Sequence, residues 1–133
     1  MCITETIAEG AARNSGSMNS SNGQFGRPNW PLEEFVEPLL RAAPSPMVSV
    51  MHTAPHLTAP ALEVVRRHWH GSLGAYAESG YFAMPDWQFV DIIPVADYVD
   101  LARQWTETFD LSMIGGCCDI GPEHIAALTA AFK

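Results

Sequence analysis

The chain has 133 residues, of which 47% are hydrophobic and 17% charged, a composition typical of one globular domain and not of a disordered segment. Its seven Lys and Arg against fifteen Asp and Glu leave a net charge of −8. This charge argues against nucleic acid or an anionic membrane as a partner, because both are bound through basic patches, and no apolar run approaches the roughly 18 residues of a membrane span.

The N-terminal segment, residues 1–30, lacks the patterns of a folded element. Its first ten residues, MCITETIAEG, have neither the basic nor the apolar region of a secretory signal, so we expect a cytoplasmic protein. Residues 10–30 are rich in Gly, Ser and Asn and show no hydrophobic period. We therefore predict a poorly ordered segment at 1–30, followed by one domain at 31–133.

Helical spacing of apolar residues recurs four times after residue 31. The strongest example is 94–110, where Tyr98, Leu101, Trp105 and Phe109 share one face. Prolines at plausible first positions and a glycine beyond one end support the others. The predicted helices are 31–43, 58–71, 94–110 and 122–132.

Short apolar runs separate these helices. We predict strands at 47–51, 72–76 and 111–114, and a long loop at 77–93. Strands that alternate with helices indicate a parallel sheet built from βα units. The predicted fold class is therefore α/β, with about three parallel βα units.

Groups able to carry chemistry follow each predicted strand. His52 follows the first strand, Tyr76 and Glu78 the second, and Cys117 and Cys118 the third. Functional groups in parallel βα folds gather at the carboxyl ends of strands, so we expect these side chains on one rim. The other histidines (His56, His68, His70 and His124) have no such placement and are interpreted as surface or capping residues.

The rim residues suggest a metal site, although other interpretations remain open. Two thiolates and one imidazole are a recognised zinc ligand set, and a vacant fourth position is typical of catalytic zinc. Gly115 and Gly116 would allow the backbone bend that turns both thiols to one ion. The alternatives are a pair of inert buried thiols, a polar residue at a strand end for His52, and a thiol redox module, which is disfavoured because Cys-x-x-Cys spacing is absent.

The C-terminal segment IGGCCDIGPEHIAAL resembles the signature of the homocysteine S-methyltransferase family, in which Gly-Gly-Cys-Cys precedes a Gly-x-x-Pro-x-His-Ile helix start. The segments GSLGAYAESGYFAMPDW and MHTAPHLTAPALEVV resemble the family's penultimate strand and the segment of its first zinc cysteine. The resemblance runs from about Leu32 to Phe132 and implies the C-terminal part of a (β/α)8 TIM barrel.

The family resemblance implies Zn²⁺ as cofactor and homocysteine as substrate. Zinc would lower the pKa of the homocysteine thiol, which attacks the methyl group of a sulfonium, betaine or folate-type donor to give methionine. Cys117 and Cys118 match two zinc ligands, whereas His52 stands where the family has its third cysteine. Glu5, in a short strand-end motif, is expected with Tyr76 and Glu78 to contact the substrate.

Length is the largest departure from the family. A complete barrel takes about 250 residues, whereas this chain supplies an incomplete barrel. We therefore expect zinc-dependent methyl transfer to homocysteine as the inherited function. The alternative is a non-catalytic truncated or split fragment that self-associates or requires an N-terminal partner half.

Overall fold

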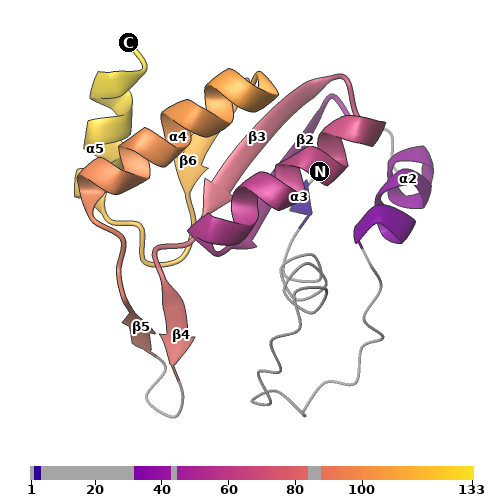
Figure 1. Cartoon of the computed structure of the whole chain (residues 1–133). Helices are drawn as coiled ribbons and strands as arrows, with labels where there is room; N and C mark the ends of the chain where they lie inside the picture. Colours follow the sequence, from indigo (N-terminus) through magenta and orange to yellow (C-terminus); the bar gives the residue numbers. More distant parts are fainter. Residues whose placement is uncertain (1, 4–31, 43–44, 84–87) are drawn as a thin grey trace.

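The computed structural model describes residues 2–3, 32–42, 45–83 and 88–133 (Figure 1). Most of the predicted poorly ordered segment 1–30 therefore lies outside the described residues. The elements follow in the order β1 (Cys2–Ile3), α2 (Leu32–Ala42), β2 (Met47–Thr53), α3 (Pro55–His68), β3 (Ser72–Ala77), β4 (Tyr81–Ala83), β5 (Gln88–Val90), α4 (Val95–Phe109), β6 (Met113–Gly116) and α5 (Pro122–Ala131).

A parallel sheet forms the centre of the described chain. Its strand order is β1-β2-β3-β6, and every neighbouring pair is parallel. The prediction of a parallel α/β arrangement is confirmed, with each of the three predicted strands within two residues of its observed position. Among the described residues the sheet is open, with β1 and β6 at its two edges.

The helices cover one face of this sheet. Figure 1 shows α3 and α4 lying across the strands, with α2 and α5 at the two sides. Each helix contacts the next in this row, α3 packs on β2 and β3, and α5 packs on β6. Alternate strand residues point toward the helices, as a pleated strand requires. The buried cluster between the two layers includes Val48, Val50, Leu62, Val65, Leu73, Ala75, Tyr98, Ala102, Trp105 and Leu128.

Arg66 connects the C-terminal ends of α3 and α4. Its guanidinium donates to the carbonyl oxygen of Phe109 from Nε at 3.0 Å and from Nη2 at 2.5 Å, and Nη2 also reaches Asp110 O at 3.0 Å. Its Nη1 donates to Gly71 O at 2.9 Å. The last carbonyls of a helix lack partners within the helix, so this cation satisfies them where the helix dipole is negative.

Two sequence predictions need correction. The predicted loop 77–93 contains an antiparallel pair, β4 and β5, which Gly80 accommodates because a Cβ there would lie 2.3 Å from Val90 O. The two-residue strand β1 pairs in parallel with β2 and leaves the prediction for segment 1–30 untested, because the rest of that segment lies outside the described residues. Helix α3 begins at Pro55 and is capped by Trp69, so the expected glycine cap is wrong.

None of the helices in the described part of the chain is long and apolar enough to cross a membrane.

We expect Arg66→Met to lower the free energy of unfolding by about 1.5–3 kcal/mol, because it leaves carbonyl groups at two helix ends without their charged donor. Arg67→Met is the matched control: Arg67 is exposed on the same helix and pairs with Glu63 in an i,i+4 ion pair, which is worth about 0.5 kcal/mol. Urea denaturation followed by circular dichroism measures both. Equal losses in the two variants would contradict the capping role of Arg66.

Candidate metal centre

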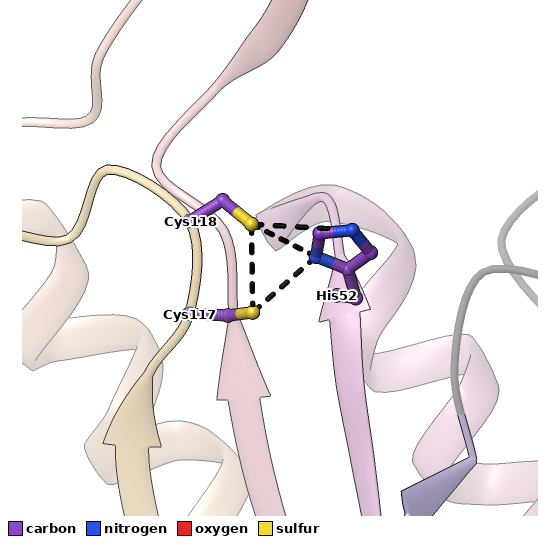
Figure 2. Close-up of side chains that lie close together, drawn as sticks. All are labelled: His52, Cys117 and Cys118. Atoms are coloured by element: carbon purple, nitrogen blue, oxygen red, sulfur yellow. Dashed lines mark hydrogen bonds between the residues drawn. The ribbon is translucent and has the colours of Figure 1, made fainter.

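His52, Cys117 and Cys118 converge at the carboxyl ends of the strands (Figure 2). His52 is the penultimate residue of β2, and both cysteines follow β6 directly. The Nδ1 atom of His52 lies 3.3 Å from Cys117 Sγ and 3.0 Å from Cys118 Sγ, and the two sulfurs are 3.7 Å apart. The predicted clustering of these side chains on one rim is confirmed.

The end of β3 holds the segment that carries His52 and the segment that carries the two cysteines together through backbone hydrogen bonds. The amide of Glu78 donates to Thr53 O at 3.1 Å, beside His52. On the other side, the amide of Cys117 donates to Ala77 O at 2.9 Å, and the amide of Ser79 donates to Cys118 O at 3.0 Å. Residues 77–79 therefore set the distance between the imidazole and the thiols.

His52 occupies a strained backbone position. Its φ is +58°, in the left-handed region that favours glycine, and the register of β2 against β3 shifts between Met51 and Thr53. One extra residue in a strand forms a bulge, which redirects the side chain that it carries. The bulge turns the imidazole toward the cysteines, and the conformation costs about 1–2 kcal/mol.

Glycine is required at positions 115 and 116 because neighbouring side chains leave no room for a Cβ. A Cβ on Gly115 would lie 2.5 Å from the Tyr76 ring, and one on Gly116 would lie 2.1 Å from the Ile120 side chain. Neither glycine has a left-handed φ, so the prediction that they supply the sharp bend is wrong. The left-handed residue of this turn is Asp119, with φ +57°, directly after Cys118.

Electrostatics keep one thiol protonated in the metal-free protein. Partial burial, followed by the adjacent Cys117 thiol and the Glu78 carboxylate, raises the pKa of Cys118 to about 11. Glu78 is thus close enough to the thiols to oppose further negative charge. A cation between the sulfurs would reverse this effect, because it favours the thiolate.

The remaining predicted site residues have different outcomes. The ring of Tyr76 lies against Gly115, and its hydroxyl contacts the sulfur of Met113. Glu78 is at the rim, beside Cys118. Glu5 lies outside the described residues. Among the other histidines, His56 and His70 are exposed as predicted.

His124 corrects the sequence interpretation. It was expected at the surface or as a cap, but it is 3% exposed and its Nε2 donates to Ile93 O at 2.9 Å. Its ring also packs edge to face on Tyr98, with the ring centroids 5.8 Å apart. Tyr98 was interpreted only as a core residue, yet its hydroxyl donates to Gly115 O at 2.7 Å, and burial raises its pKa so that it keeps the proton.

The donor set fits one tetrahedral metal ion. Bond lengths typical of zinc to thiolate and imidazole place two sulfurs about 3.8 Å apart and a sulfur and a nitrogen about 3.6 Å apart. The three observed donor distances are within about 0.6 Å of these values. Two thiolates and a neutral imidazole also balance a divalent charge.

Comparisons with known proteins identify the family of the chain. The chain is similar to the homocysteine methyltransferase MmuM from Escherichia coli, whose apo crystal structure aligns with a TM-score of 0.55 at 27% identity. The alignment covers 76% of this chain and 32% of that protein, so the chain spans about a third of its length. A search of curated protein sequences returned no match. The model of the homocysteine S-methyltransferase family matches residues 7–132, and the chain therefore belongs to this family.

Proposed function

We propose that Cys117, Cys118 and His52 bind zinc and that homocysteine donates its thiol to the remaining coordination position, as the acceptor of a methyl group. The observation that carries this proposal is the convergence of three soft donors, all within 4.8 Å of one another, in a chain of this family. The methyl donor would be a sulfonium, betaine or folate-type compound, and the product methionine.

The chemistry follows from the charges of the donor set. Zinc, when bound, lowers the pKa of a thiol that coordinates it. His52 in place of a third thiolate makes the set less negative, so the incoming thiol is acidified more but its sulfur is the poorer nucleophile. Glu78 and Tyr76 are assigned to the substrate: the carboxylate would face its ammonium group and the phenol its carboxylate or chain.

We propose that the chain forms the C-terminal part of a (β/α)8 barrel. Support comes from the parallel arrangement of β2, β3 and β6. A helix follows β2 and β6, and β3 is followed by the antiparallel pair β4 and β5 and then by α4. The alternative function is that of a non-catalytic barrel fragment. The open edges of the described sheet and the one-third coverage of the Escherichia coli protein favour it, because an unpaired edge recruits further strands.

Purified protein should contain about one zinc per chain under reducing conditions. The double variant Cys117→Ser, Cys118→Ser should lose it, because a hydroxyl does not replace a thiolate ligand. Cys2→Ser is the matched control, since it removes the third cysteine of the chain and should leave the zinc content unchanged. Elemental analysis measures all three proteins, and retention of zinc by the double variant would place the metal elsewhere.

Variants of His52 should separate metal binding from stability. His52→Gly and His52→Ala should both weaken zinc binding, but only glycine relieves the left-handed φ of +58°. Without metal, His52→Gly should therefore exceed His52→Ala in free energy of unfolding by about 1 kcal/mol. His52→Cys should tighten zinc binding by supplying a third thiolate. Competition with a chromophoric chelator gives the affinities, and unchanged affinity in both truncations would remove His52 from the ligand set.

Homocysteine should bind the metal-loaded protein through sulfur. In the cobalt-substituted protein it should intensify the thiolate-to-metal charge-transfer band, whereas homoserine, which lacks the thiol, should not.

We expect the isolated chain to self-associate in light scattering and to form little methionine from any of the three donor types. A monodisperse monomer that turns over homocysteine would contradict the fragment alternative, while an unchanged cobalt spectrum would contradict substrate binding at the metal.

A further inference from the structure

Tyr98 joins the helix layer to the backbone that carries the thiols. The side chain is fully buried in α4, and its hydroxyl donates to Gly115 O at 2.7 Å, with Ala77 O 3.4 Å away. Gly115 precedes Cys117 by two residues, and Ala77 O already accepts the amide of Cys117 at 2.9 Å. The phenol of Tyr98 therefore lies between the ends of β3 and β6, which determine the backbone position of Cys117.

The ring of Tyr98 is itself held in place. Trp105 and His124 pack on it edge to face, at interplanar angles of 87° and 88°. His124 is fixed by its bond to Ile93 O, and the amide of Ile93 donates to Ser79 O at 2.8 Å. This chain of contacts links Tyr98 back to the end of β3. Side chains of α4 and α5, together with the ends of β3 and β6, therefore fix the position of the phenol.

The backbone before the thiols needs such an external tie. Gly115 and Gly116 have no side chains, and glycine is the residue with the greatest backbone freedom. Strand β6 lies at the edge of the described sheet and pairs with β3 on one side. The hydroxyl of Tyr98 holds the Gly115 carbonyl from the helix side.

We infer that Tyr98 is a positioning residue for the metal centre, which it serves by holding the Gly115 carbonyl and thereby the direction in which the chain enters Cys117 and Cys118. The inference rests on the metal centre proposed above. Groups that orient metal ligands without touching the metal typically change affinity by about 10–100-fold when they are removed.

The test compares Tyr98→Phe with Thr106→Val. The first variant removes the hydroxyl and keeps the ring. The second removes a hydroxyl from the same helix, whose bond of 2.8 Å goes to Ala102 O within α4 and not to β6. Tyr98→Phe loses the bond to Gly115 O and the longer one to Ala77 O, whereas Thr106→Val loses one hydroxyl–carbonyl bond that does not reach the metal centre. A purely structural role of Tyr98 predicts lower stability in both variants and unchanged zinc binding in both.

The readouts are zinc affinity by chelator competition, the ligand-field spectrum of the cobalt-substituted protein, and hydrogen exchange of the Cys117 amide in the metal-free state. Tyr98→Phe should bind zinc about 10–100-fold more weakly, shift the cobalt bands and exchange the Cys117 amide faster. Thr106→Val should match the unmodified protein in all three. If Tyr98→Phe does not fold, His124→Gln supplies the comparison, because it removes the ring that braces Tyr98 and keeps an amide donor for Ile93 O.

Two negative results are distinct. The positioning role alone would be overturned if Tyr98→Phe had the same zinc affinity and cobalt bands as the unmodified protein, whatever its loss of stability. The same holds for His124→Gln if that variant is used. Absence of zinc binding in the unmodified protein would instead overturn the metal centre itself, and the positioning role with it.

Discussion

The hydrogen bonds at the carboxyl end of β3 are the constraint on which the site depends. Residues 77–79 bond to Thr53 on one side and to Cys117 and Cys118 on the other. The segment of Thr53 and the segment of the two cysteines are more than 60 residues apart in the chain, since His52 and Cys117 are separated by 65 residues. A parallel sheet brings such distant segments together because every strand ends at the same edge. The donor cluster is thus a consequence of strand pairing.

The site combines local strain with close packing. His52 and Asp119 both adopt left-handed φ values, which cost stability unless the surrounding structure imposes them. Gly115 and Gly116 sit where any side chain would collide with Tyr76 or Ile120. The left-handed backbone of His52 and of Asp119 therefore lowers the stability of the fold close to the thiols. Such features concentrate at functional sites and support the assignment of this rim to metal binding.

His52 stands where the family resemblance implies a cysteine, which would change the chemistry of the proposed metal site. The family resemblance implies three thiolates, whereas the proposed site would have two thiolates and an imidazole, whose Nδ1 faces both sulfurs. Glu78 adds a negative charge next to Cys118, where it raises the thiol pKa. In the proposed metal site the imidazole of His52 would make the donor set less negative, whereas the Glu78 carboxylate adds a negative charge beside it.

The sequence alone determined the strand–helix alternation, the three main strands to within two residues, and the residues of the rim, because periodicity and strand ends are local properties. It also carried the family signature at residues 114–128. Only the tertiary structure decided that His52 forms a bulge and that β4 and β5 form an antiparallel pair. It also decided that Gly115 and Gly116 are needed because a side chain would not fit there, and not for their dihedral freedom. It also decided the roles of Tyr98 and His124: one looked like a core aromatic and the other like a surface histidine, and both depend on contacts with carbonyls from other elements. Such partners are set by how helices pack on strands, which no local pattern encodes.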